Sequence, residues 1–204
     1  MLDVLEVYER PYNSKLPVVC LDEKSQQLLK DVKGRLPIPP KPGKPGRRDY
    51  EYQRNGTVNL FVAVEPKAGE RVVRVTRRRT GKDYASFIKY LIDHIYRKSE
   101  QIILVEDNLN THSEKTLVEH LGESEGKRLS QKIRWHYTPK HASWLDQAEI
   151  EIHSLETQCL KRRIPTFHKM QSEVAACVRK RNQDKCRINW QFTREKAREK
   201  FKLT

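Results

Sequence analysis

Several features are scarce in this sequence. The 204 residues include only 4 cysteines, which lie far apart without a Cys-x-x-Cys pair, so a disulfide scaffold and a zinc ribbon are disfavoured. No stretch approaches the roughly 18 uninterrupted apolar residues that a membrane helix needs. The N-terminus, MLDVLEV, carries acids where a secretory signal peptide carries its basic region. These absences exclude an integral membrane protein and favour the reducing cytoplasm over secretion.

Acidic residues are in the minority. The chain has 41 Lys and Arg against 27 Asp and Glu, a formal net charge of +14. On charge alone, a polyanionic partner such as nucleic acid and a merely soluble basic surface are both open. The basic residues gather in four runs, at 47–48, 77–79 (Arg77, Arg78 and Arg79), 161–163 and 179–181. Because such runs bind phosphates without reading sequence, they favour contact with DNA.

The apolar patterns predict an α/β fold. Alternating or continuous apolar runs predict strands over 16–22, 57–64, 71–76, 101–107 and 132–137. Three- and four-residue apolar spacings predict helices over 82–97, 113–121, from 143 to a break near 165, over 168–181 and over 193–200. Residues 122–126 interrupt the helical pattern. Since the later strands alternate with helices, we expect a mixed five-stranded sheet flanked by helices on both faces.

The length suits one domain of roughly 150 residues with appendages. We assign residues 1–15 to an N-terminal lead-in, 16–158 to the domain and 159–204 to a C-terminal helical extension. The segment LPIPPKPGKPG holds five prolines, which fix φ and cannot donate to a sheet. We therefore interpret residues 36–50 as a proline-rich arm inserted between two strands of one sheet.

Two of the predicted strands end in an aspartate, Asp22 and Asp107. Taken singly, either residue is typical of a turn or a helix cap. In an open α/β sheet, however, ligands bind beyond the carboxyl ends of strands, so the two side chains would meet there if their strands are neighbours. Carboxylates that lie close together repel unless a cation sits between them. Hard oxygen ligands suit Mg²⁺, and two such ions can clamp a phosphodiester.

A third acidic ligand would come from the helix that follows Pro139. Asp146, Glu149 and Glu151 all lie on it. Asp146 and Glu149 are three residues apart and share a face, whereas Glu151 points elsewhere. The spacing leaves the choice between Asp146 and Glu149 open.

The three acidic segments resemble the signature blocks of one family. They read CLDEKS at 20–25, EDNLNTH at 106–112 and YTPKHASWLDQAE at 137–149, and they are supported by DYEYQRNG at 49–56, QCLKRRI at 158–164 and NWQFT at 189–193. In this order they resemble bacterial insertion-sequence transposases of the mariner-type superfamily. The resemblance spans about Val4 to Phe201.

The resemblance implies an RNase H-like catalytic domain with a DDE triad. It assigns Asp22, Asp107 and Glu149 as the catalytic residues and as ligands of two Mg²⁺ ions, with Mn²⁺ as a substitute. The implied reactions are cleavage of DNA at transposon ends and strand transfer. The implied partners are double-stranded DNA, of the transposon ends and the target, and a second copy of the chain. The implied location is the cytoplasm, on the nucleoid when DNA is bound.

Further residues lie beside these acids in the sequence. The resemblance places them near the active site, where they would support the acids or contact DNA: Lys24, Asn108, His112, Lys140 and His141, with Arg77, Arg78 and Arg79 as additional DNA contacts. The alternative for each histidine is an imidazole satisfied by backbone groups, and for each lysine a solvated charge.

Three departures from the family pattern leave other functions open. Glu106 stands where an apolar residue is usual, and Asp146 stands where an amide is usual. Either acid would weaken a metal site by repulsion or else face solvent. The chain also begins almost at the catalytic domain, without the helix-turn-helix domains of full-length relatives. The alternatives are therefore an RNase H-like nuclease without strand transfer and an inactive, DNA-binding transposase remnant.

Overall fold

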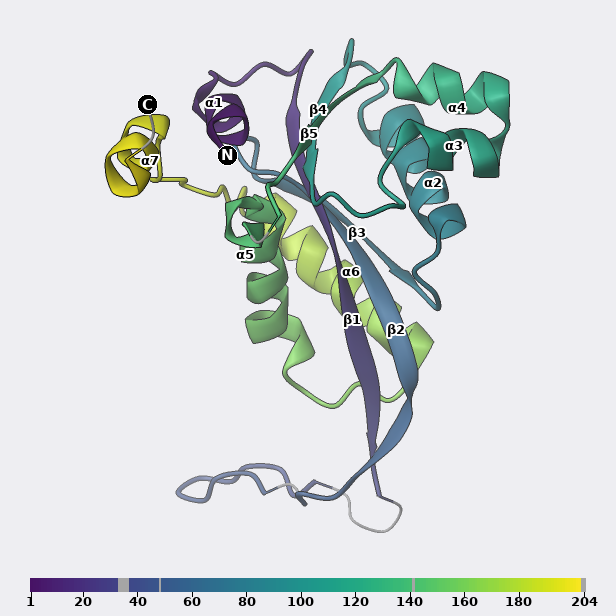
Figure 1. Ribbon diagram of the computed structural model, residues 1–204. Coiled ribbons are helices and arrows are strands. Elements are labelled where there is room, and N and C mark those ends of the chain that lie inside the picture. The colour runs from purple at the N-terminus through teal and green to yellow at the C-terminus, as the bar shows by residue number, and fades with distance from the viewer. Residues whose placement is uncertain (33–36, 48, 141, 203–204) are drawn as a thin grey trace.

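The computed structural model describes residues 1–32, 37–47, 49–140 and 142–202. Its centre is a five-stranded sheet with the order β3-β2-β1-β4-β5 (Figure 1). The strands are β1 (Val18–Asp31), β2 (Tyr52–Glu65), β3 (Glu70–Thr76), β4 (Ile102–Glu106) and β5 (Ile133–Tyr137). The pairs β1–β2 and β2–β3 are antiparallel, and the pairs β1–β4 and β4–β5 are parallel. The predicted mixed five-stranded sheet is confirmed.

Helices cover both faces of this sheet (Figure 1). They are α1 (Leu2–Glu9), α2 (Gly81–Tyr90), α3 (Glu114–Leu121), α4 (Glu123–Ser130), α5 (Gln147–Leu155), α6 (Phe167–Gln183) and α7 (Arg194–Phe201). Two π-helical turns, η1 (Leu91–Ile95) and η3 (Glu156–Leu160), extend α2 and α5, and a 3-10 turn, η2 (Ser143–Leu145), precedes α5. Helices α2, α3 and α4 lie on one face, and α1, α5 and α6 lie on the other.

Successive side chains along the central strands point to opposite faces of the sheet and so belong to two separate hydrophobic cores. Val19 and Leu21 of β1 pack with α2 and α3, whereas Cys20 packs with α1 and the start of α5. This is the two-residue period of a strand that is buried on both faces. A third cluster joins the outer part of β2 to α5, η3 and α6. The face that carries Cys20 is therefore the face that meets α5.

Strand β1 is longer than the sequence predicts. We expected a strand that ends at Asp22, but β1 runs on to Asp31 and pairs with β2 as far as Asp31↔Tyr52. The added half of β1 is polar because ladder hydrogen bonds need only the backbone, so no apolar run marks it. Together β1 and β2 form a long ribbon that projects from the body of the molecule (Figure 1). Asp22 thus lies inside a strand and not at its end.

The helical region after β4 also differs from the prediction. Only Gly122, with a φ of 87°, separates α3 from α4, and the helix resumes at Glu123 where we expected a longer break. Gly126 lies within α4, and a Cβ there would approach Cα of Val118 to 2.5 Å. The second glycine therefore permits close packing of α4 on α3 and does not break the helix.

The chain ends and the arm complete the fold. The predicted lead-in contains α1, whose Val4, Leu5 and Val7 are fully buried, and α7 reaches the same cluster through Ala197. The part of the proline-rich arm that is described carries two isolated bridges, Ile38↔Arg47 and Lys41↔Lys44. Among the described residues, no helix is long and apolar enough to cross a membrane.

Candidate active site

Asp22 and Asp107 come from neighbouring parallel strands and lie level with each other. Strand β1 pairs with β4 through Cys20↔Val105, and each aspartate follows two residues after its member of that pair. Cys20 and Val105 both belong to the cluster beneath α5. Since side chains two residues apart share a face, Asp22 and the Asp107 that follows β4 are directed to the α5 side of the sheet.

The charges of three acids meet on this side. Burial, helped by the charges of Asp107 and Glu149, raises the pKa of Asp22 to about 7, although a hydrogen bond from the Glu23 amide acts in the opposite direction. Glu149 lies in the first turn of α5 and is exposed. Helix α5 starts there because Asp146 caps it, its Oδ1 accepting a hydrogen bond of 2.8 Å from the Ala148 amide. The structure thus brings Asp107 and Glu149 within electrostatic reach of Asp22.

The chemistry of these side chains fits a divalent cation. Oδ1 of Asp107 is buried with Nδ1 of His112 2.8 Å away, and hard carboxylate oxygens such as those of Asp22, Asp107 and Glu149 are what Mg²⁺ binds. A cation between the acids would also relieve the repulsion that adds to the effect of burial on the pKa of Asp22. Within the described ranges, however, no three His, Cys, Asp or Glu side chains are already grouped closely enough to hold a metal ion. The assignment of the triad stays a prediction.

The His112 imidazole contacts the Asp107 carboxylate. Its Nδ1 lies 2.8 Å from Oδ1 of Asp107 and its Nε2 lies 3.0 Å from Oε1 of Glu23. Burial alone lowers the pKa of His112, but the acids Asp107, Glu23 and Glu106 outweigh this effect and raise the pKa to about 11. The imidazole is therefore a cation that holds several carboxylates together. Its Nδ1 also lies 3.0 Å from the backbone carbonyl oxygen of Asp107. The ring therefore contacts both a backbone group and a predicted site acid, and its role in the site stays a prediction.

Glu106 does not face solvent. Its side chain is completely buried, and the Tyr84 hydroxyl lies 3.1 Å from both carboxylate oxygens. Burial raises the pKa of Glu106 to about 8. Glu106 and Asp107 point to opposite faces because they are adjacent at a strand end. The extra acid therefore sits beneath α2, apart from the face of Asp22, with His112 as its neighbouring cation.

Asp146 does not face solvent either. It is 2% exposed and caps α5, and its Oδ2 has no hydrogen-bond partner. Burial raises its pKa well above the usual value, and the charges of Asp22, Glu106 and Asp107 act in the same direction. An asparagine would cap the helix equally well. The aspartate thus replaces the usual amide in the cap role and adds a buried acid near the aspartate pair.

The remaining predicted residues are less tightly held. Asn108 and Lys140 are exposed, while Lys24 forms an ion pair with Glu156 of η3. Arg77 stacks on the Phe167 ring with its guanidinium carbon 4.6 Å from the centroid, and the side chains of Arg78 and Arg79 lie on the exposed β3–α2 loop. His141 lies outside the described residues.

Sequence reasoning missed Glu23 and Tyr84 as parts of the site. Glu23 directly follows Asp22, but no pattern indicated that its side chain is 2% exposed and bound to His112. Tyr84 lies in the helix predicted over 82–97, yet its hydroxyl donates to Glu106. A tyrosine on the buried face of a helix was the available signal. A buried hydroxyl needs a hydrogen-bond partner, so a polar group was to be expected beside it.

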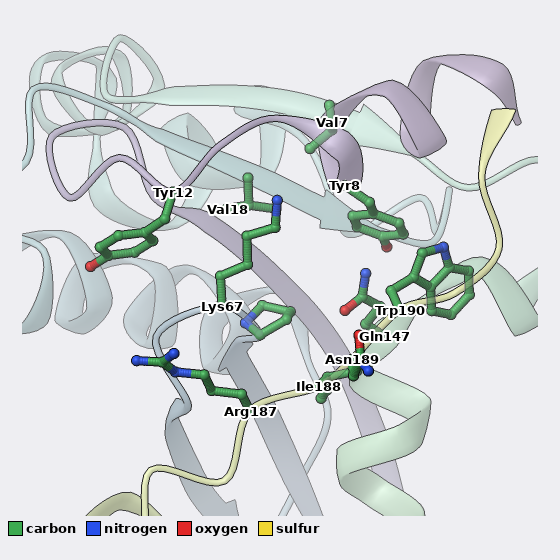
Figure 2. Close-up of a pocket in the computed structure, with 11 residues that line it drawn as sticks. Val7, Tyr8, Tyr12, Val18, Lys67, Gln147, Arg187, Ile188, Asn189 and Trp190 are labelled. Atoms are coloured by element: carbon green, nitrogen blue, oxygen red, sulfur yellow. The ribbon is translucent and has the colours of Figure 1, made fainter.

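A cavity of about 520 Å³ lies elsewhere, between α1, the β2–β3 turn and the segment after α6. Tyr8, Trp190 and Gln147 form one side of it, and Lys67 and Arg187 the other (Figure 2). None of the described residues predicted for the active site lines this cavity. This cavity is therefore separate from the predicted active site.

Comparison with known proteins places this geometry in context. Residues 17–171 match the family described as DDE superfamily endonuclease. No protein of curated function matches the chain. The structure is similar to the crystal structure of the Mos1 mariner paired end complex with Mn, with a TM-score of 0.61 and 14% identity over 90% of this chain and 54% of that one.

A second similar structure is the Mos1 Strand Transfer Complex, with a TM-score of 0.58 and 15% identity over 90% of this chain and 53% of that one. At such identities the likeness is one of fold. The chain spans about half the length of the solved structures that it matches.

Proposed function

Because this chain belongs to the DDE superfamily endonucleases, we propose that it is the catalytic part of a mariner-type transposase that cuts DNA ends and joins them to target DNA. The observation that carries the proposal is the placement of Asp22 and Asp107. They lie at the same level at the ends of the paired segments of adjacent parallel strands. The charge of Glu149 on α5 contributes to the raised pKa of Asp22.

In this proposal, Asp22 and Asp107 hold the cations and Glu149 completes their ligand set. Two Mg²⁺ ions, or Mn²⁺ in their place, supply when bound the activation of water and the stabilisation of charge on the scissile phosphate. His112 keeps the Asp107 carboxylate oriented through its contact with Oδ1. Asp146 caps α5 and so supports its first turn, which carries Glu149.

The two reactions use the same acids. In cleavage, a water oxygen bonds to phosphorus, and the strand leaves with a free 3′-hydroxyl. In strand transfer, that 3′ oxygen bonds to a phosphorus of target DNA, and the 3′ oxygen of the target strand leaves. One phosphodiester breaks and one forms, so the second step needs no other energy source. No covalent bond to the protein is required in either step.

Double-stranded DNA is the partner in this proposal, and a homodimer is the working unit. The net charge of +14 and the exposed arginines of the β3–α2 loop support electrostatic binding to the phosphate backbone. A duplex is too large for a closed pocket, and the exposed position of Glu149 agrees with that requirement.

Nicking of supercoiled plasmid by the purified chain with Mg²⁺ or Mn²⁺ tests the proposal. We expect nicking by the unaltered chain, none by Asp107→Ala, and unchanged nicking by Asp184→Ala, which alters an exposed aspartate at the end of α6. A nicking Asp107→Ala protein would refute the assignment. Adding a pre-cut DNA end with a 3′-hydroxyl tests joining: cleavage without joined product indicates a nuclease, and salt-sensitive binding alone indicates an inactive remnant.

A further inference from the structure

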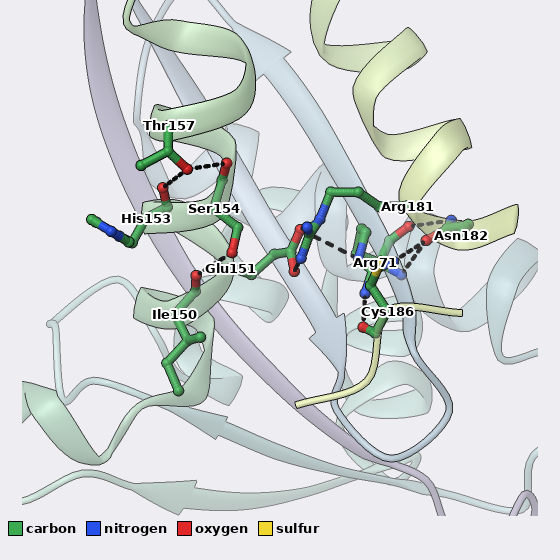
Figure 3. Close-up of polar contacts among 9 residues, drawn as sticks. All are labelled: Arg71, Ile150, Glu151, His153, Ser154, Thr157, Arg181, Asn182 and Cys186. Carbon is green, nitrogen blue, oxygen red and sulfur yellow. Dashed lines mark hydrogen bonds and ion pairs between the residues drawn. The ribbon is translucent and has the colours of Figure 1, made fainter. Parts of the chain in front are cut away.

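Glu151 is a buried charge on the helix that carries Glu149. It lies two residues further along α5, a rotation of about 200° around the helix axis, and its side chain is 0% exposed. Nε and an Nη atom of Arg181 donate to the two oxygens of Glu151, each at 2.8 Å. This parallel double hydrogen bond fixes direction as well as distance. Helix α5 is therefore bound to the end of α6 through Glu151 (Figure 3). The helical rotation places Glu149 on the opposite side of α5.

A second arginine joins the same carboxylate to the sheet. Nε of Arg71, on β3, lies 3.3 Å from Oε1 of Glu151, and its side chain is also fully buried. The Oδ1 of Asn182 accepts hydrogen bonds of 3.0 Å from both the amide and Nη1 of Arg71, and the carbonyl of Cys186 accepts from Nη2. The cluster thus connects α5, the edge strand β3 and the chain that leaves α6 (Figure 3).

A second ion pair holds the other end of this helical segment. Glu156, in η3 directly after α5, is paired with Lys24 of β1. Lys24 lies two residues beyond Asp22 on the same strand. The segment that carries Glu149 is therefore held at one end through Glu156 to the strand of Asp22 and near its middle through Glu151 to β3 and α6.

A gain in stability alone does not account for this choice of residues. Buried ion pairs are often no more stabilising than apolar residues of similar volume, and their better-supported role is to select one arrangement among several. Apolar contacts of α5, such as those of Ala148 and Leu155, tolerate small rotations because they lack direction. The charged cluster does not tolerate them, because its hydrogen bonds are directional.

We propose that Glu151, held by Arg181 and Arg71, is a positioning residue that sets the rotation of α5 and so places the carboxylate of Glu149 relative to Asp22. The inference rests on the proposed function of Glu149 as a metal ligand. Glu151 itself contacts neither cation nor DNA. It acts through the position of the helix. Loss of a hydrogen bond in the cluster therefore weakens cation binding although every ligand is still present.

The test compares Arg181→Lys with Arg97→Lys in the full chain. Lysine keeps a positive charge beside Glu151 but cannot make the parallel double hydrogen bond. Arg97 is exposed and lies between η1 and β4. We measure the Kd for Mn²⁺ by calorimetry without DNA, the Mg²⁺ concentration for half-maximal nicking, and the thermal midpoint. We expect Arg181→Lys to raise the Kd and the Mg²⁺ requirement roughly tenfold to a hundredfold, with nicking restored at high Mg²⁺ and Arg97→Lys unchanged.

A double variant shows whether the effect passes through Glu149. In a Glu149→Gln background, Arg181→Lys should leave the Mn²⁺ Kd unchanged. An Arg181→Lys protein with a lowered thermal midpoint but an unaltered Kd would overturn the inference alone. An unaltered chain that neither binds Mn²⁺ nor nicks would overturn the proposed function and this inference with it. If Arg181→Lys does not fold, Asn182→Ala, which releases Arg71, takes its place with the same expected result.

Discussion

Nδ1 of His112 lies 2.8 Å from Oδ1 of Asp107 and 3.0 Å from the Asp107 carbonyl oxygen. The loop after β4 therefore folds back so that one imidazole contacts both the side chain and the backbone of a predicted metal ligand. The other ring nitrogen is bound to Glu23, next to Asp22 in the chain. His112 thus links the loop after β4, which carries Asp107, to strand β1, which carries Asp22.

Replacing His112 with glutamine should impair both folding and nicking. Glu23 and Glu106 are buried beside the imidazole, and a buried carboxylate that loses its cation costs about 3–5 kcal/mol. We expect the free energy of unfolding in urea to fall by about that amount and plasmid nicking to fall at least tenfold. His168→Gln, at an exposed position on α6, serves as the control. Unchanged nicking by His112→Gln would separate His112 from the site.

The metal-free protein should lose stability as the pH rises from 5 to 8. The pKa of Asp22 is about 7 in the folded protein and about 3.9 in an unfolded chain. The folded state therefore binds more protons in this range, so the contribution of Asp22 is present at low pH and is lost as the pH passes 7. In EDTA, the thermal midpoint should fall less between pH 5 and pH 8 for Asp22→Asn than for the unaltered chain. Mg²⁺ should restore the midpoint at pH 8 in the unaltered chain only; equal slopes in both proteins would contradict this.

Asp146→Asn should stabilise the protein at pH 8. Asparagine caps helices as well as aspartate does, and it removes an acid whose pKa burial raises well above its usual value. The gain in the free energy of unfolding should shrink as the pH falls, because the raised pKa lets Asp146 take up a proton at a higher pH than an ordinary carboxyl group does. Asp146→Ala is the comparison, because it also removes the hydrogen bond to the Ala148 amide and should lose about 1 kcal/mol relative to Asp146→Asn. A destabilised Asp146→Asn protein would indicate that the charge itself is needed.

Arg78→Gln should weaken DNA binding equally for duplexes of different sequence. Arg78 is exposed on the β3–α2 loop, and a lost phosphate contact lowers the slope of log affinity against log salt by about 1. Binding of fluorescent duplexes from 50 to 200 mM salt measures the slope. Lys98→Gln, between η1 and β4, is the control. A slope identical to that of the unaltered chain would remove the loop from the proposed DNA surface.

The sequence predicted most elements because apolar patterns mark them. The five strands, the helix over 113–121, and the direction of Glu151 away from Glu149 were all confirmed. It did not predict the polar half of β1, since a backbone ladder leaves no apolar trace. It also took Gly126 for a helix break, because the close approach of Val118 is visible only in the packed helices.

The order of apolar runs and acidic blocks along the chain was enough to determine the mixed sheet and the family. Tertiary structure alone decided which buried charges face each other: His112 with Glu23, and Glu151 with Arg181, residues 89 and 30 positions apart. The physical reason is that the partner of a buried charge does not recur at a fixed spacing along the sequence, as apolar residues of a strand or helix do. Its partner is chosen by the packing that removes both from water, and that packing exists only in the folded chain.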